Sequence, residues 1–169
     1  MTSFACRNRV MVASDLDAVS LLDGECYPGR HWCIETLERH YHGKARCAVA
    51  VATLHSPRPD GLIGYVLHTL DRRGRLTRLL RLGVASECRR LGVGGKLLDR
   101  VLTYALKHDY PAALALEAVL EDDLLPGAHA FLRSQGYRLV PGRSGHGTGL
   151  TTFGINLHQE SCASFPGVD

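Results

Sequence analysis

The sequence lacks any apolar run that approaches the roughly 20 residues a membrane-spanning helix needs. Residues 1–9 contain no apolar signal core, so we expect a cytoplasmic protein with no membrane partner. An excess of charge is also missing, because a net charge of +3 over 169 residues gives no reason to expect a nucleic-acid partner. What remains is an ordinary globular protein whose hydrophobic content of 45% is sufficient for a real core.

Metal-ligand spacing is absent as well. The six cysteines form no C-x-x-C pair, and the nine histidines show no ligand spacing beside them. We therefore expect scattered, reduced thiols and no metal. Cys88 is followed directly by Arg89, whose positive charge is expected to lower the pKa of the Cys88 thiol.

The length and the lack of internal repeats predict one domain over residues 1–157, followed by an unstructured tail at 158–169. Strands are expected at 7–13, 47–53, 62–70, 77–85, 112–120, 137–140 and 149–157, and helices at 14–26, 31–41, 94–108 and 128–135. Ser14 or Asp15 is expected to cap the first helix. Gly136 is expected to end the last helix in a left-handed conformation.

A glycine-rich turn with two arginines lies between the strand at 77–85 and the helix at 94–108. Its residues are Arg89, Arg90, Leu91, Gly92, Val93, Gly94 and Gly95. Glycine lets the backbone approach a ligand closely, and the free N–H groups at a helix N-terminus bind anions. The turn is therefore typical of a phosphate-binding site.

Two familiar phosphate-binding motifs do not fit this turn. A Walker A loop would need glycine at Arg90 and a hydroxyl residue at Leu97. The dinucleotide motif G-x-G-x-x-G fits Gly92 and Gly94 but fails at Leu97, where its third glycine belongs. The pattern that remains is Arg-x-x-Gly-x-Gly.

This pattern, formed by Arg89, Gly92 and Gly94, resembles the acyl-CoA-binding motif of the GCN5-related N-acetyltransferases, the GNAT superfamily. Residues 128–137 resemble the family's A-x-x-F-Y-x-x-x-G-F segment, and the expected elements follow the family's order. The resemblance covers residues 7–157. It implies an α/β (α+β) GNAT fold, with a mixed, mostly antiparallel central sheet of about seven strands and about four flanking helices.

The resemblance also implies acetyl-CoA as cosubstrate and a primary amine as acceptor. In this family the coenzyme pyrophosphate lies on the glycine-rich turn, which here runs from Arg90 to Gly95. Pantetheine amides pair with the end of the preceding strand, which is here Leu82, Gly83 and Val84. Asp122 or Asp123 falls where relatives often have an asparagine near the pantetheine, and a solvated loop is the alternative.

The resemblance fails at the catalytic acid. Many members protonate the departing thiolate with a tyrosine four residues before the glycine of the G-F pair, and this chain has Leu132 there. Glu117 is the first candidate for the base that deprotonates the amine, because a lone carboxylate in an apolar strand is costly unless it is paired or functional. It also resembles the glutamate of the L-E-V segment in ribosomal-protein N-terminal acetyltransferases. A strand-end carboxylate without a catalytic role is the alternative, and His129 is the second candidate.

In the family the acceptor enters beside the first two helices and the loop that joins the last strands, here 143–148. The residues that this implies are Glu25, Tyr27, His31 and Trp32. Tyr27-Pro28 followed by Trp32 resembles the F-P-W segment of the ribosomal-protein N-terminal alanine acetyltransferases. Three hypotheses follow: a protein N-terminal acetyltransferase, a small-molecule amine or polyamine acetyltransferase, and a non-catalytic acyl-CoA-binding domain motivated by Leu132. Both a monomer and a homodimer fit the sequence.

Overall fold

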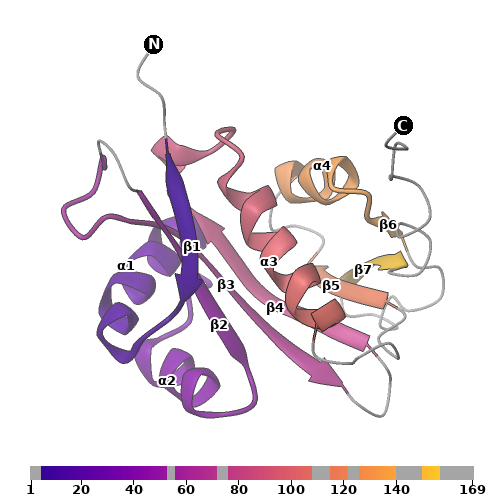
Figure 1. The fold of residues 1–169 in the computed structure, drawn as a ribbon, viewed down its shortest axis with the longest axis horizontal. Helices are drawn as coiled ribbons and strands as arrows, with labels where there is room; N and C mark the ends of the chain where they lie inside the picture. Colours follow the sequence, from indigo (N-terminus) through magenta and orange to yellow (C-terminus); the bar gives the residue numbers. More distant parts are fainter. Residues whose placement is uncertain are drawn as a thin grey trace, which may run out of the picture. The chain divides into compact units, whose positions relative to one another are not determined.

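The computed structural model describes residues 5–52, 56–71, 76–107, 115–121, 126–139 and 150–156. Within these ranges, seven strands, four α-helices and two short 3-10 helices follow one another in the expected order (Figure 1). The described residues fall into two compact units, one within 1–69 and 80–101 and the other within 70–79 and 102–169. The predicted tail at 158–169, the loop at 143–148 and Asp123 lie outside the described residues.

The first unit is built on strands β1 to β3 and the second half of β4. The bounds of the elements that contribute to it are β1 Cys6–Val10, η1 Ala13–Asp15, α1 Leu16–Cys26, α2 Ile34–His42, β2 Arg46–Ala52, β3 Leu62–Asp71, β4 Leu76–Val84, η2 Ser86–Cys88 and α3 Val93–Lys107. β1 pairs antiparallel with β2, and β2 pairs antiparallel with β3. In this register Arg46 lies opposite His68.

Helices α1 and α3 cover opposite faces of β3. A Cβ at Gly64 would lie 3.1 Å from side-chain atoms of both Val93 and Leu97, so the glycine lets α3 pack closely on one face. Tyr65 points to the other face, because side chains alternate along a strand, and its hydroxyl donates to Asp23 of α1. The apolar side chains buried in this unit include Val19, Leu22, Leu37, Val49, Ile63, Leu67, Leu97, Leu98 and Val101.

The first helix begins differently from the prediction. Residues Ala13–Asp15 form a 3-10 turn, and α1 starts at Leu16. The Asp15 carboxylate does not cap α1, because it accepts bonds from the Arg9 guanidinium at 2.6 and 2.7 Å and from the Val12 N–H at 2.8 Å. The hydrogen bonds from Arg9 also hold the pKa of Asp15 below its usual range.

The second unit contains the first half of β4 and the last elements of the chain, β5 Ala115–Glu121, α4 Pro126–Ser134, β6 Arg138–Leu139 and β7 Leu150–Asn156. β4 pairs parallel with β5 from Leu76 to Leu79, whereas β5 and β6 each pair antiparallel with β7. The strand order is β1-β2-β3-β4 in the first unit and β4-β5-β7-β6 in the second. The expected mixed, mostly antiparallel sheet of seven strands is therefore confirmed.

Two smaller expectations concern helices. Gly136, which follows α4, has a φ of 85°, so the predicted left-handed end of this helix is confirmed. In the part of the chain that is described, every helix is too short or too polar to cross a membrane.

Candidate active site

The glycine-rich turn has the backbone shape of an anion-binding site. Arg90 and Gly92 have positive φ angles of 62° and 79°. The Gly92 carbonyl accepts from the Lys96 N–H at 3.1 Å, and α3 begins at Val93, one residue before the expected start. The N–H groups of residues 93–95 therefore have no carbonyl partner within the helix. Such a run of backbone N–H groups after left-handed residues is a typical anion site.

Conformation, and not space, requires a glycine at position 92. A Cβ there would meet no atom within 4 Å, but L side chains rarely adopt its φ. Arg90 adopts the left-handed conformation although it is not a glycine, and its side chain is exposed. Arg89 is also exposed, and its Nε donates to the Val84 carbonyl at 3.1 Å. Both arginines thus lie at the turn with exposed side chains, and the charge of Arg89 is one of the effects that lower the pKa of Glu87.

The end of β4 has one backbone edge that is free of strand pairing in the described registers. The register with β5 ends at Leu79, and the Ala85 N–H donates to the Ile63 carbonyl of β3 at 3.0 Å. Backbone N–H and C=O groups alternate in direction along a strand. Since Ala85 points its N–H to β3, the N–H and C=O groups of Leu82 and Val84 point to the edge away from β3. These are two of the three residues predicted to pair with pantetheine.

Side chains from the end of α1 reach this edge. The Tyr27 hydroxyl donates to the Leu82 carbonyl at 2.5 Å, and Cys26 Sγ lies 3.5 Å from the Val84 carbonyl. Burial raises the pKa of the Cys26 thiol, although Arg89 partly opposes this effect. Tyr27 is thus placed at the backbone edge, and its predicted contact with the acceptor stays a prediction.

Tyr27 belongs to a set of buried and half-buried residues that we call the Arg81 cluster: Asp23, Tyr27, Trp32, Tyr65 and Arg81. Arg81 donates to the Asp23 carboxylate from Nε at 2.8 Å and from Nη2 at 3.0 Å. The same carboxylate accepts from the Trp32 N–H at 2.6 Å and from the Tyr65 hydroxyl. The side chains of Asp23 and Arg81 are 0% and 10% exposed, so a fully buried carboxylate is held by four donors.

Aromatic rings complete the Arg81 cluster. The Arg81 guanidinium carbon lies 3.6 Å from the centre of the Tyr27 ring and 5.1 Å from that of Trp32, within the range of cation–π attraction. A Cβ at Gly83 would lie 2.9 Å from Cζ of Tyr65, so this ring leaves room only for a glycine on β4. Gly83, predicted as a coenzyme contact, therefore also has a packing role.

Burial determines the protonation states in this cluster. Burial raises the pKa of Tyr27 to about 12, although the nearby Arg81 charge opposes it. Burial and the negative charge of Asp23 raise the pKa of Tyr65 far above its ordinary value. Burial alone would lower the pKa of Arg81, but the hydrogen bonds and charge of Asp23 outweigh it and the pKa is raised. Both phenols are consequently protonated and Arg81 is charged at neutral pH.

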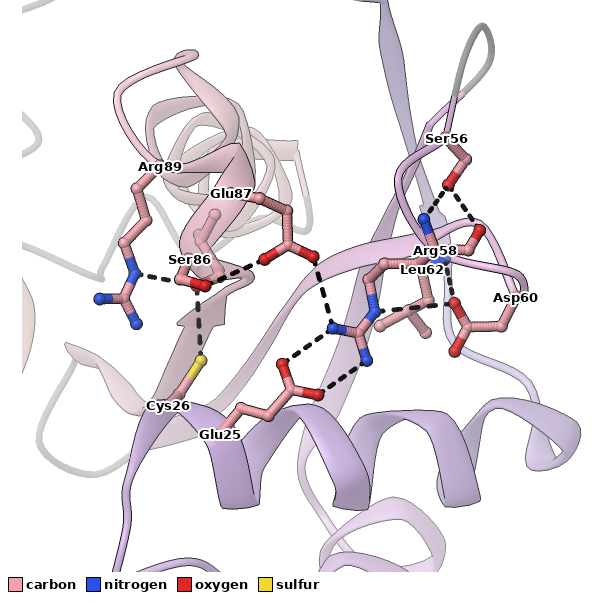
Figure 2. Close-up of polar contacts among 10 residues, drawn as sticks. Glu25, Cys26, Ser56, Arg58, Asp60, Leu62, Ser86, Glu87 and Arg89 are labelled. Atoms are coloured by element: carbon pink, nitrogen blue, oxygen red, sulfur yellow. Dashed lines mark hydrogen bonds and ion pairs between the residues drawn. The ribbon is translucent and has the colours of Figure 1, made fainter.

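A second group of charges, the Arg58 cluster, contains Glu25, Arg58, Asp60 and Glu87 (Figure 2). Arg58 donates to the Glu25 carboxylate at 2.8 and 3.0 Å, and its nitrogens lie 3.8 Å from Asp60 and 3.7 Å from Glu87. The three acidic side chains are between 37% and 49% exposed. Glu25, predicted as an acceptor contact, is therefore engaged by an arginine that links α1 to η2.

Sequence reasoning missed Asp23, Tyr65 and Arg81. A signal was present, because Asp23 lies four residues after Val19 and three before Cys26, both on the apolar face of the first helix. A carboxylate on a buried helix face needs a partner. Arg81 indicated the partner, because it is a charged residue within the apolar strand that precedes the glycine-rich turn.

The other predicted residues lie in the second unit. Glu117 is in β5, where the register places it opposite Arg78 of β4 and Gly154 of β7. His129 lies half-buried on α4. Leu132, on the same helix, is 3% exposed and is therefore a core residue. Its side chain has no proton to donate to a leaving group.

The prediction for Cys88 is wrong. Its side chain is buried, and burial together with the charge of Glu87 raises the pKa of the thiol. The adjacent Arg89 guanidinium donates instead to the Val84 carbonyl. Among the described residues, no group of three or more His, Cys, Asp or Glu side chains could hold a metal ion.

Comparison with known proteins identifies the family. Residues 16–137 match the family model of the Acetyltransferase (GNAT) family, which is well over half of the chain. The chain belongs to the GNAT acetyltransferase family. None of the curated proteins matches its sequence.

Solved structures of GNAT acetyltransferases share the fold at low sequence identity. The ribosomal-protein-S18-alanine N-acetyltransferase of Escherichia coli has a TM-score of 0.69 at 12% identity, with coverage of 96% of this chain and 97% of that one. NAA60 of Arabidopsis thaliana, in complex with acetyl-CoA, has a TM-score of 0.68 at 20% identity, with coverage of 91% and 99%. Nourseothricin acetyltransferase has a TM-score of 0.65 at 19% identity, with coverage of 90% and 99%. These likenesses support the GNAT fold.

Proposed function

We propose that this GNAT protein is a cytoplasmic N-acetyltransferase that transfers the acetyl group of acetyl-CoA to a primary amine, with a protein N-terminus as the favoured acceptor. The observation that carries the proposal is the turn before α3, where left-handed Arg90 and Gly92 precede the free N–H groups of residues 93–95. NAA60, a structural neighbour, was solved with acetyl-CoA. Acetyl-CoA carries the pyrophosphate that such a turn recognises.

The coenzyme would extend from the turn along β4. With the pyrophosphate at residues 90–95, pantetheine runs back along the backbone edge of Val84 and Leu82, where its amides find strand-like partners. The thioester then reaches Leu82, next to the Tyr27 hydroxyl. In this proposal the backbone N–H at the end of β4 stabilises the charge that develops on the thioester oxygen.

The reaction would be a direct attack of the neutral amine on the thioester carbon. Glu117 remains our proposal for the base that accepts the amine proton, with His129 as its alternative. Asp123 remains a proposed pantetheine neighbour. No metal is required for this chemistry, because the thioester is already activated.

The charge distribution favours a peptide N-terminus over a polyamine. The two carboxylates at the end of α1, Asp23 and Glu25, are bound by Arg81 and Arg58, so neither is free to attract a polycation. Tyr27 and Trp32 are half-buried aromatic residues at the position where the family receives its acceptor. Neighbours of this fold include an N-acetyltransferase whose name specifies an alanine of a ribosomal protein.

The test of the coenzyme site compares two glycines with similar strain. Gly92 and Gly29 have φ angles of 79° and 76°, and a Cβ at either would meet no atom within 4 Å. Gly92→Ala is expected to weaken acetyl-CoA binding in calorimetry by about tenfold, since the left-handed conformation costs an L residue about 1–2 kcal/mol. Gly29→Ala is expected to bind normally. Equal affinities of wild type and Gly92→Ala would reject the turn as the pyrophosphate site.

The acceptor class is tested by CoA-thiol release in the presence of acetyl-CoA. One pool contains peptides with free N-termini, and the other contains spermidine and related polyamines. Release with the peptide pool alone is the expected result. Release with the polyamines alone would contradict the argument from Asp23 and Glu25, and binding without release by either pool would support the non-catalytic alternative.

A further inference from the structure

The buried Leu132 raises a chemical question that rests on the proposed function. When an amine displaces coenzyme A, the sulfur leaves as a thiolate, and a proton donor makes it a better leaving group. Leu132 is 3% exposed and carries no acidic proton. Apart from water, a donor would come from the residues that border the thioester.

Three side chains among the described residues donate to the backbone carbonyls at the free edge of β4. They are Tyr27 on Leu82, and Cys26 and Arg89 on Val84. Arginine does not give up its proton in a protein. Cys26 is a weak donor at 3.5 Å, whereas Tyr27 is a hydroxyl at 2.5 Å. Tyr27 is also the residue nearest to the proposed position of the thioester.

Burial raises the pKa of Tyr27, so the free phenol keeps its proton, and the nearby Arg81 charge is the largest effect that favours its loss. The Arg81 guanidinium carbon lies 3.6 Å from the centre of the Tyr27 ring, so a positive charge is adjacent when the phenolate forms. Asp23 fixes Arg81 by two hydrogen bonds, and the Arg30 carbonyl accepts a third at 2.7 Å. This support is present before any ligand binds, so little reorganisation is needed during the reaction.

We propose that Tyr27 is the catalytic acid of this enzyme and takes the role that Leu132 cannot perform. The amine nitrogen forms a bond to the thioester carbon, and the C–S bond then breaks with its electron pair on sulfur. Tyr27 Oη passes its proton to the sulfur, which leaves as a free thiol. As the amide forms, the nitrogen gives one proton to the base, which releases it to solvent, and the Tyr27 phenolate beside Arg81 takes up one proton from solvent. One amide and one thiol are formed, and the enzyme is restored.

The first test removes only the hydroxyl. In Tyr27→Phe the ring stays over Arg81, so the fold and the acetyl-CoA affinity are expected to remain. With acetyl-CoA and the most active peptide of the panel, kcat is expected to fall by about 100-fold or more, the usual range for a lost acid. Tyr41→Phe, which removes a phenol from α2, is the matched control and is expected to keep wild-type kcat.

The second test separates proton donation from a structural role. A ring-fluorinated tyrosine placed at position 27 has the same shape and a more acidic phenol. The kcat profile is then expected to acquire an alkaline limb at the lower phenol pKa, with activity retained below it. A merely structural hydroxyl would leave the profile unchanged, and this result would overturn the proposal.

The remaining outcomes distinguish the two proposals. Tyr27→Phe with wild-type kcat, or with only a raised KM for the peptide, would overturn the role of Tyr27 and leave the acetyltransferase assignment in place. Wild-type protein that fails to bind acetyl-CoA would overturn the proposed function. Binding without any CoA release would overturn the catalytic role of Tyr27 while keeping the coenzyme site.

Discussion

Two arginines each hold a carboxylate from the last turn of α1, but in different surroundings. Arg81 binds Asp23 where the two side chains are 10% and 0% exposed, and Arg58 binds Glu25 where they are 14% and 49% exposed. Both contacts are two-pronged, with distances of 2.8 and 3.0 Å in each. Geometry is therefore the same, and solvent access to the carboxylate is what differs.

The same contact therefore has different consequences on a buried and on an exposed side of one helix. In the buried pair, each charge depends on the other, because removal of one leaves an uncompensated charge out of water. In the exposed pair, water replaces a lost partner at little cost. We expect Asp23 to be indispensable for the fold and for the placement of Tyr27, and Glu25 to be replaceable.

The largest expected effect comes from removal of the buried carboxylate. Asp23→Ala leaves Arg81 charged and unpaired in the interior and also removes the acceptor for Tyr65 and the Trp32 N–H. The free energy of unfolding is expected to fall by about 3–5 kcal/mol, measured by denaturant titration. Asp17→Ala, at an exposed position of the same helix, is the matched control and is expected to change it by less than about 0.5 kcal/mol.

A double variant tests the reason for this loss. Asp23→Leu combined with Arg81→Met removes both charges and keeps apolar volume, so it is expected to recover a large part of the stability lost in Asp23→Ala. A double variant as unstable as the single one would show that an unpaired charge is not the cause.

An intermediate effect concerns His68, which is 4% exposed on the α3 face of β3. Burial first, and then the charges of Arg46 on β2 and Arg100 on α3, lower its pKa to about 4. In the unfolded chain His68 takes up a proton near pH 6.5, whereas in the folded protein it does so only near pH 4. The stabilising contribution of neutral His68 is therefore present above pH 6.5 and is lost as the pH falls toward 4. The loss expected from this group is about 3 kcal/mol, from 1.36 kcal/mol per pKa unit.

The His68 prediction is checked by unfolding titrations at pH 7 and pH 4.5. Other groups, such as Asp15, also lose stability in acid, so the comparison is with His68→Gln. This variant is expected to show a clearly smaller difference between the two pH values, and His31→Gln, at an exposed position, should behave as wild type. Equal pH dependence in His68→Gln and wild type would contradict the prediction.

Sequence patterns were sufficient where the physics is local. The apolar spacing of α3 placed its start and end each within one residue of the structure, because one face of a helix repeats every three or four positions. The turn at Gly92 and the end of α4 at Gly136 were also predictable, since glycine allows the positive φ that both adopt.

The same patterns could not pair charges that are distant in sequence. Asp23 and Arg81 are far apart along the chain, and only the packing of α1 on β4 brings them together. Asp15 was expected to cap a helix, but Arg9 of β1 occupies both of its oxygens. Glu25 was predicted as an acceptor contact, and the sequence did not indicate that Arg58, in the segment before β3, binds it.

The smallest expected effect is that of Glu25→Gln, which completes the comparison. Arg58 keeps Asp60 and Glu87 within 4 Å after the change, and water reaches its vacated side, so the stability loss is expected to be below about 1 kcal/mol. The loss should vanish in about 1 M salt, where the screening length is only about 3 Å, whereas the Asp23→Ala loss should persist. Denaturant titrations of both variants at low and high salt measure this. A salt-resistant loss of stability in Glu25→Gln as large as that in Asp23→Ala would mean that solvent exposure does not explain the difference between the two ion pairs. The Arg58 cluster would then be as essential to the turn before α3 as the Arg81 cluster is to Tyr27.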